Sequence, residues 1–262
     1  MKLARNILIA AGVVLMVVGI IIMAATVSTK GFYIKDYAEE EYEEKEYKFS
    51  GKVDSIDIDS SVADVEFFIN ESDELKVEIK QSERIQYDVA FNNGELKIKS
   101  DKKHGINLFF DGLYTDLHIY VYLPNTEIDN IKIDGSVGSV KIPAITCNDM
   151  KLDLSTGATE LKGVLVKNDL DIDSSTGSVR LIDVKAGKME LDVSTGSIYF
   201  ENCEADEIDA DASTGSIKGT LKGDYDYKAD SSTGSVSVPS SSGSRRCKLS
   251  ASTGCIDIKK AK

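Results

Sequence analysis

Apolar and polar positions recur along the second half of the chain with a period of 19 or 20 residues. Apolar residues stand two and four positions after a recurring glycine, and five and seven positions before it. Spacing by two is typical of strands with one buried face, so each period predicts two short strands. A period this regular predicts stacked units that contact mainly their neighbours. The glycines that mark the period are Gly138, Gly157, Gly177, Gly196, Gly215, Gly234 and Gly254.

The corner between the two strands of each repeat is predicted at a Ser-Thr-Gly phrase, such as Ser194-Thr195-Gly196. Glycine permits the positive φ that a tight corner often needs. The Ser and Thr hydroxyls are expected to bond nearby backbone groups there. Two short strands in 19 residues predict a flattened solenoid, whose equivalent positions stack about 4.8 Å apart.

The first half of the domain predicts less regular β-structure. Residues 59–65 resemble a degenerate copy of the corner phrase, so residues 49–70 are expected to form an early coil. The segment Asp101–Thr115 interrupts the pattern with a cluster of apolar residues. It is either a cap on one solenoid end or an exposed contact patch. The expected strands are Phe49–Ile58, Val62–Ile69, Leu75–Lys80, Ile85–Phe91, Glu95–Ser100 and Leu117–Leu123.

An uncharged apolar run, Ile7–Val27, is long enough to cross a bilayer as a helix. Lys2 and Arg5 precede it, so the positive-inside rule places the N-terminus in the cytoplasm and the rest outside. We therefore expect a single-pass protein of the cell membrane with an extracytoplasmic C-terminal domain. The alternative is a signal peptide cleaved near Ala24.

The predicted organisation has three parts. Residues 1–27 form a signal-anchor helix, residues 28–48 form an acidic solvated stalk, and residues 49–262 form the β-solenoid. Within the solenoid, residues 49–133 are irregular and residues 134–262 are regular repeats. The predicted fold class is all-β, a repeat solenoid after one transmembrane helix.

Charge and composition exclude several functions. The net charge is −13 and the pI is near 4.7, which argues against a nucleic-acid partner, because phosphate binding needs clustered Lys and Arg. His104 and His118 are isolated, and Arg180, Arg245 and Arg246 do not align in the repeat. No common catalytic motif occurs in the sequence. We therefore expect no enzyme activity and no cofactor.

The repeat register places the cysteines. Cys203 and Cys247 align with core apolar positions of other repeats. Cys147 is too far from Cys203 for a disulfide, which tolerates a Cα separation of about 7 Å. Cys255 replaces an outward serine. Free thiols are expected, and Cys247–Cys255 is the one pair left open.

An aspartate recurs four residues before most of the glycines, and Ser250 ends the series. Three interpretations remain open for these stacked carboxylates. They accept hydrogen bonds at the corners, or solvent and salt screen them, or they collect Ca²⁺. The ladder consists of Asp134, Asp153, Asp173, Asp192, Asp211 and Asp230, of which the last five are the calcium candidates.

The stretch Ile119–Pro124, then Ile128–Ile133, then the Asp-x-Ser-Thr-Gly-Ser-Val phrases resemble the bacterial putative-adhesin family of unknown function. Members resemble the accessory protein of cell-envelope-stress operons in Gram-positive bacteria. The resemblance implies a β-solenoid-like fold and membrane or surface placement, but no catalytic residues and no function.

Two functions are carried forward. The first is a surface scaffold or adhesin-like binding protein, whose partner is a cell-wall glycan or an envelope protein. The second is an envelope-stress accessory protein that modulates a membrane sensor or regulator.

Overall fold

The computed structural model describes residues 42–261 except 83–84, 102–116 and 242, and these residues contain strands and no helix. No helix in this described part of the chain could span a membrane. The predicted anchor, most of the stalk and most of the loop Asp101–Thr115 lie outside it. The strands are β1 (Tyr42–Ser50), β2 (Ser55–Val62), β3 (Asp64–Ile69), β4 (Glu74–Ser82), β5 (Gln86–Asn92), β6 (Glu95–Asp101), β7 (His118–Leu123), β8 (Glu127–Val137), β9 (Val140–Ile142), β10 (Thr146–Thr156), β11 (Thr159–Lys162), β12 (Leu165–Thr176), β13 (Val179–Ile182), β14 (Lys185–Thr195), β15 (Ile198–Thr214), β16 (Ile217–Leu221), β17 (Tyr225–Thr233), β18 (Val236–Ser237), β19 (Arg245–Thr253) and β20 (Ile256–Lys260).

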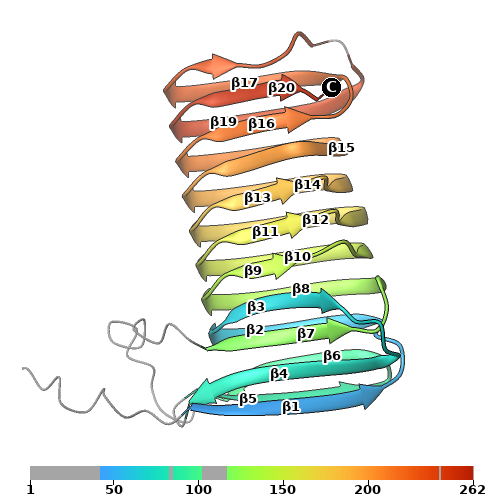
Figure 1. Ribbon diagram of the computed structural model, residues 1–262. Coiled ribbons are helices and arrows are strands. Elements are labelled where there is room, and N and C mark those ends of the chain that lie inside the picture. Colours follow the sequence, from blue (N-terminus) through green and yellow to red (C-terminus); the bar gives the residue numbers. More distant parts are fainter. Residues whose placement is uncertain (1–41, 83–84, 102–116, 242, 262) are drawn as a thin grey trace, which may run out of the picture. The chain divides into compact units, whose positions relative to one another are not determined.

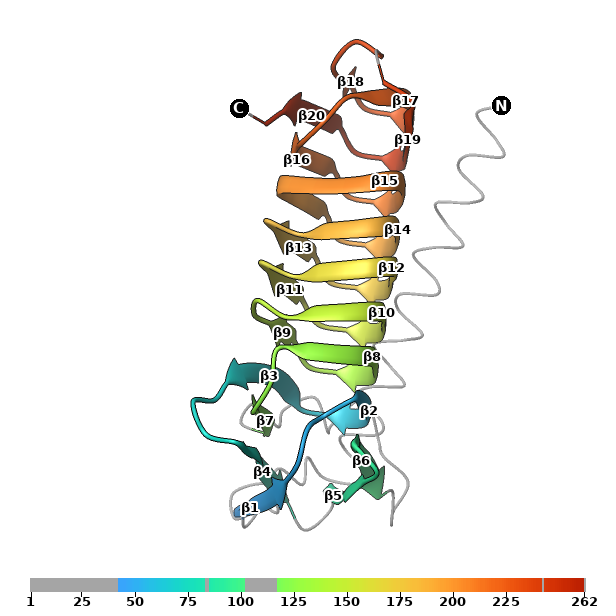
Figure 2. The same ribbon diagram turned by 90° about the vertical axis from the view of Figure 1, so that its right-hand side faces the viewer.

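The strands stack into two facing sheets, which confirms the all-β class (Figures 1 and 2). Each coil contributes one strand to sheet A and one to sheet B, and like strands pair in parallel. Pairing of Leu152 with Ile172, and of Ile172 with Leu191, keeps equivalent residues opposite each other. The sequence period is therefore the length of one coil.

The core lies between the sheets as columns of apolar side chains. Leu152, Ile172, Leu191 and Ala210 form one column in sheet B, and all are fully buried. Parallel backbone pairing continues from coil to coil, so only the end strands have an open edge. Burial of aliphatic columns and the continuous ladder together stabilise the elongated shape.

The N-terminal end departs from the repeat. The early coil predicted at residues 49–70 is present as β2 and β3, but it lies inside the stack and does not form its end. Strands β6 and β7 cover it, and antiparallel β4, β1 and β5 complete the end. Strand β1 begins at Tyr42, inside the segment assigned to the stalk. Lys45, Tyr47 and Phe49 alternate as its half-buried residues. The glutamates around them make the segment look like a solvated stalk in the sequence.

The C-terminal end also breaks the sequential order. Strand β15 pairs with β19, not β17, and β16 pairs with β20, not β18. The last coil of the chain is thus inserted beneath the penultimate one, which forms the end of the stack (Figure 1).

Charge opposite Glu207 favours this inserted order. Arg246 and Lys248 of β19 form ion pairs with Glu207 and Asp209 of β15. In the same register β17 would place Asp226 opposite Glu207, where like charges destabilise a sheet, whereas Lys228 would face Asp209 just as Lys248 does.

Buried tyrosines satisfy backbone groups at both interrupted ends. The pairing of β2 with β6 stops at Asp59, and the Tyr87 hydroxyl donates to the Val62 carbonyl at 2.9 Å. The pairing of β15 with β19 begins only at Glu207, and the Tyr225 hydroxyl accepts the Ala205 amide at 3.1 Å.

Candidate functional site

The corner glycines are required by close backbone stacking. At Gly196 the φ is +147°, and a Cβ would lie 1.9 Å from the Gly177 carbonyl oxygen. Gly177 and Gly215 show the same arrangement with the corner below each. The Gly196 amide donates to the Thr214 carbonyl at 2.8 Å, so backbone pairing runs through the corner. Both the positive φ and the lack of space exclude a side chain here.

The Ser and Thr hydroxyls before each glycine are exposed, and no hydrogen bond to them is present among the described residues. The expectation that they bond the corner backbone is therefore wrong, because the coil above already supplies those bonds. The serine after the glycine has that role instead. Ser197 accepts the Ser216 amide at 3.1 Å, and Ser178 accepts the Ser197 amide at 3.3 Å. The exposed pairs are Ser155–Thr156, Ser175–Thr176, Ser194–Thr195, Ser213–Thr214, Ser232–Thr233 and Ser252–Thr253.

The aspartate ladder forms in the predicted register. Asp153 pairs with Asp173, Asp173 with Asp192, and Asp192 with Asp211. Ser250 does not end the series, because the inserted strand β19 places it between Asp211 and Asp230. Among the calcium candidates, Asp153, Asp173, Asp192 and Asp211 are therefore neighbours and Asp230 stands apart.

The surroundings of the ladder are those of screened carboxylates. Burial and the charges of Asp173 and Asp211 raise the pKa of Asp192. Lys151 pairs with Asp173 at 3.7 Å, and Lys132 with Asp134 at 2.6 Å. No ladder carboxylate bonds a corner amide within the described residues. In the same residues no group of three or more His, Cys, Asp or Glu side chains is arranged for a metal ion.

All four cysteines are free thiols. Burial raises the pKa of Cys147 and Cys247 to about 12 and that of Cys203 to about 11, which keeps these thiols protonated. Cys255 occupies the corner serine column, where its amide donates to the Ser216 hydroxyl at 3.2 Å.

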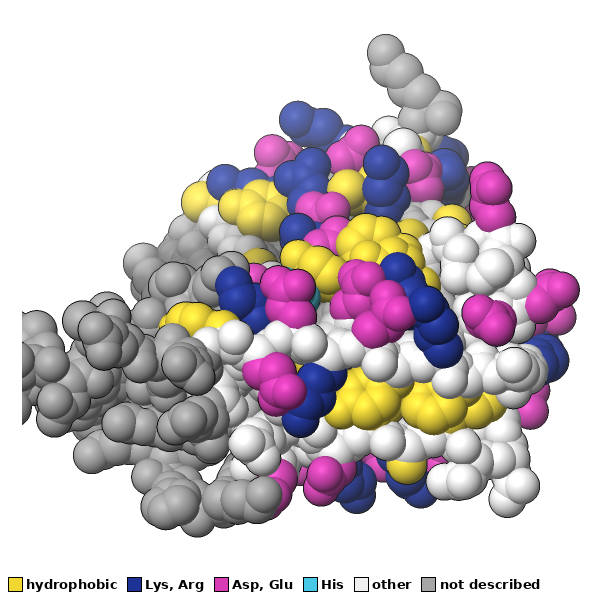
Figure 3. Space-filling view, turned by 60° about the horizontal axis from the view of Figure 1, so that its bottom comes forward, with side chains coloured by type: hydrophobic (Ala, Val, Ile, Leu, Met, Phe, Trp, Pro, Cys, Tyr) yellow, Lys and Arg dark blue, Asp and Glu magenta, His cyan; other side chains and the backbone are white. Residues whose placement is uncertain are grey.

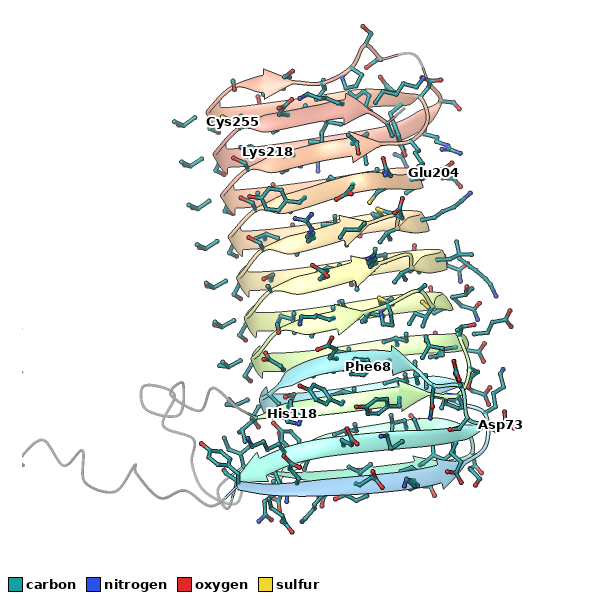
Figure 4. The ribbon with its side chains drawn as sticks, viewed as in Figure 1. Phe68, Asp73, His118, Glu204, Lys218 and Cys255 are labelled. Atoms are coloured by element: carbon teal, nitrogen blue, oxygen red, sulfur yellow. The ribbon has the colours of Figure 1, made fainter. Side chains whose placement is uncertain are left out.

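The sequence reasoning missed an aromatic surface on the outer face of sheet A. His118, Tyr120 and Tyr122 follow one another along β7, and Phe68 of β3 lies opposite Tyr122. We call these four side chains the aromatic platform. Figure 4 labels Phe68 and His118 on the face turned toward the viewer. The available signal was the alternation of aromatic with aliphatic residues in Leu117–Leu123, which predicted the strand but not which face is exposed.

The platform consists of two stacked ring pairs. Phe68 and Tyr122 stack with ring centroids 4.9 Å apart, and His118 and Tyr120 stack at 4.1 Å. Phe68 also meets Tyr120 edge to face at 5.6 Å. The Lys76 ammonium lies 4.0 Å from the Tyr122 ring centroid, a distance at which a cation is attracted to a ring face.

Acidic and basic side chains are interspersed with apolar ones over this end of the molecule (Figure 3), and those beside the platform form opposite pairs. Lys76 bonds Glu78 at 2.9 Å, and Lys141 pairs with Glu66 at 3.5 Å. Tyr122 donates its hydroxyl to Glu78 at 2.8 Å. The Lys76 hydrogen bond lowers the pKa of Glu78, while burial and the Glu78 carboxylate raise the pKa of Tyr122 to about 12.

A depression of about 490 Å³ lies where β1, β4 and β7 meet near Asp73. Its lining contains carboxylates and Lys52 but no paired nucleophile and base. It is lined by Ser50, Gly51, Lys52, Asp73, Glu74, Pro124 and Asn125.

The fold and these surfaces define an all-β protein of stacked two-strand coils with a corner glycine in each regular coil. The chain belongs to the Toastrack DUF4097 family, whose model matches residues 53–261. The resemblance drawn from the repeat phrases is thereby confirmed. Comparison with curated proteins finds no match.

Several solved structures are similar. A putative adhesin from Bacteroides fragilis NCTC 9343 has a TM-score of 0.53 and 16% identity, over 84% of this chain and 98% of that chain. A putative cell adhesion protein from Clostridium sporogenes ATCC 15579 has a TM-score of 0.39 and 14% identity, over 84% of this chain and 100% of that chain. At this identity the first similarity shows a shared fold only.

Proposed function

We propose that this protein is a membrane-anchored, extracytoplasmic and non-catalytic surface scaffold, an adhesin-like binding protein. The observation that carries the proposal is the repeated lateral surface. Each corner from Gly157 to Gly254 presents an exposed Ser–Thr pair whose hydroxyls have no hydrogen-bond partner among the described residues, whereas the Gly138 corner carries Ser136 and Val137 instead. A surface of equivalent groups at fixed spacing can engage a polymer or a large partner through many weak contacts.

Charge pairing supports the absence of catalysis. The arginines that could serve as electrophiles are held by carboxylates: Arg245 bonds Glu204 at 2.7 Å, and Arg180 pairs with Glu201 at 3.3 Å. His118 is stacked on Tyr120, without a carboxylate in hydrogen-bond contact in the described structure. A catalytic site needs acid, base and electrophile converging on one substrate position, and these groups are dispersed.

Anchoring is proposed from the run Ile7–Val27 and the flanking Lys2 and Arg5. The adhesion names of the structural neighbours are consistent with surface placement, although they describe those proteins.

Protease treatment of intact cells tests the topology. The full chain carries a C-terminal epitope tag, and a cytoplasmic marker reports cell integrity. We expect protease to remove the tag while the marker stays intact. A tag that is protected until the cells are lysed would show that the domain is not extracytoplasmic.

A second candidate is an envelope-stress accessory protein that modulates a membrane sensor or regulator. The predicted single-pass helix favours it, because a helix of this kind can contact a sensor within the bilayer. Deletion of the gene is expected to change the response to cell-wall damage. If the deletion leaves the response to cell-wall damage unchanged and the domain is exposed on the cell surface, only the scaffold function remains.

A further inference from the structure

We propose that the aromatic platform binds the pyranose rings of a neutral polysaccharide. This inference rests on the proposed surface-binding function and names the class of partner for it. It is carried by four side chains, His118, Tyr120, Tyr122 and Phe68, and by the paired charges that surround them.

The platform rings are not needed to fill the core. Ile119 and Val121 of β7 point inward and are fully buried, so the core beneath the platform is already packed. The equivalent outward column of sheet A in the regular coils carries Lys141, Glu160, Arg180 and Lys218, with Tyr199 as its one aromatic residue. The clustering of several outward aromatic residues on β3 and β7 therefore distinguishes this part of the sheet.

The rings are held in place before any ligand arrives. Phe68 stacks on Tyr122, whose other side faces the Lys76 ammonium, and Tyr122 is tied to Glu78 through its hydroxyl. His118 stacks on Tyr120. Because these contacts fix the side chains, binding loses little conformational entropy, which favours affinity.

Phe68 and His118 are half-buried, and among the described residues each is stacked on one ring, Phe68 on Tyr122 and His118 on Tyr120. A pyranose has an apolar face of C–H groups that packs on such a ring, and a rim of hydroxyls that needs polar partners. We assign the ring-packing contacts to Phe68 and His118.

The surrounding charges fit a neutral partner. Lys76 is paired with Glu78, and Lys141 with Glu66, so the platform has both donors and acceptors without a dominant charge. Sugar hydroxyls can donate to the carboxylates and accept from the ammonium groups. A polyanion would meet Glu66 and Glu78, and a polycation would meet Lys76 and Lys141, so a charged polymer gains nothing from this arrangement.

Affinity gel electrophoresis of the detergent-solubilised full chain tests the inference. The probes are neutral polysaccharides cast in the gel, namely a mannan, a β-glucan and a galactan, with polygalacturonate and chitosan as charged counterparts. We expect at least one neutral polysaccharide to retard the protein. Retardation by the charged polymers alone, or by none of the five, would overturn the inference.

Ring removal locates the contact. Phe68→Thr and His118→Thr keep a residue suited to a strand but delete the ring, and each is expected to weaken retardation roughly threefold to tenfold. Phe68→Tyr keeps the ring and is expected to bind like the parent. Tyr199→Thr is the matched control, because Tyr199 is an exposed aromatic residue, 40% accessible, on sheet A away from the platform.

The outcomes separate this inference from the proposed function. Equal binding by Phe68→Thr, His118→Thr and the parent would refute the platform as the site, even where protease treatment places the domain outside the cell. A loss of binding in Tyr199→Thr as large as in Phe68→Thr would also refute it. Thermal melting of each variant shows whether the fold is kept, and the binding of His118→Thr decides the matter if Phe68→Thr unfolds.

Discussion

At the scale of single residues, the glycine and the two hydroxyl residues of the Ser-Thr-Gly corner have different physical roles. Glycine is required because its neighbour's carbonyl occupies the space of a Cβ, as at Gly196. The preceding Ser194 and Thr195 are exposed and make no hydrogen bond within the described residues. Backbone packing therefore requires the glycine, whereas the two hydroxyl groups contribute to the exposed surface and not to the fold.

Gly196→Ala is expected to destabilise the protein by more than about 1 kcal/mol, because alanine is strained at positive φ and its Cβ would overlap the Gly177 carbonyl. Ser194→Ala is the control and should change the free energy of unfolding by at most about 0.5 kcal/mol. Urea denaturation measures both. Equal stability of the two variants would show that the stacked corner tolerates a side chain.

Tyr225→Phe is expected to lower stability by about 1–3 kcal/mol, because the buried Ala205 amide loses its hydrogen-bond acceptor. The ring itself stays, so the core volume hardly changes. Tyr199→Phe, at an exposed position, is the control. A Tyr225→Phe variant as stable as the parent would mean that another group replaces the phenol.

At the scale of strands, the sequence predicted the regular coils well, because alternation within each strand and the repeat period are both visible along the chain. Alternation identified strands such as β4 and β6, and the period fixed the pairing of Asp173 with Asp192. The single strand expected at Phe49–Ile58 is instead the end of β1 and the beginning of β2, with a break at residues 51–54. The start of β1 at Tyr42 was not predicted, because its half-buried residues lie between glutamates. The platform was also missed, since aromatic alternation does not say which face meets solvent.

The aspartate ladder gives a prediction at the scale of neighbouring strands. The pKa of Asp192 is raised by burial and by Asp173 and Asp211, so the folded state holds its proton more tightly than the unfolded state does. Ionisation above that pKa therefore lowers stability. Asp192→Asn should raise the free energy of unfolding at pH 7 by about 0.2–1 kcal/mol. Below the unfolded pKa of about 3.9 the gain should vanish, because the Asp192 carboxyl is then protonated in both the folded and the unfolded state.

Calcium separates screening from binding at the same ladder. If the carboxylates are only screened, melting temperatures in chelator and in millimolar Ca²⁺ should differ by about one or two degrees. A specific site would raise stability by about 2.7 kcal/mol at a hundredfold excess over the dissociation constant. A large shift with Ca²⁺ that Asp192→Asn abolishes would establish a cation site.

At the scale of the whole molecule, the early coil of β2 and β3 and the last coil of β19 and β20 both lie inside the stack, although they come from opposite ends of the domain's sequence. The period could not reveal this, because every repeat carries the same strand and corner pattern and therefore fits any layer. The decision depends on non-repeating residues. Arg246 pairs with Glu207, which Asp226 would repel, and the phenols of Tyr87 and Tyr225 satisfy the backbone at the interruptions.

The inserted order makes the last coil an internal one, which truncation can test. Strand β17 pairs with β19, and β18 with β20, so removing residues 244–262 takes away the partners of both. Residues 225–237 should then become sensitive to protease, although they stay in the chain. Simple sequential stacking predicts the reverse, because there the deletion would remove only a terminal layer.

Removal of residues 222–262 provides the matched control, since it deletes both coils and leaves β15 and β16 as the end of the stack. Limited proteolysis followed by mass spectrometry compares the two truncations. We expect early cleavage within residues 225–237 in the shorter deletion and a resistant remainder in both. Protection of residues 225–237 without β19 and β20 would show that β17 and β18 can pair directly with β15 and β16, so that the charges of β19 would not determine the order of the coils.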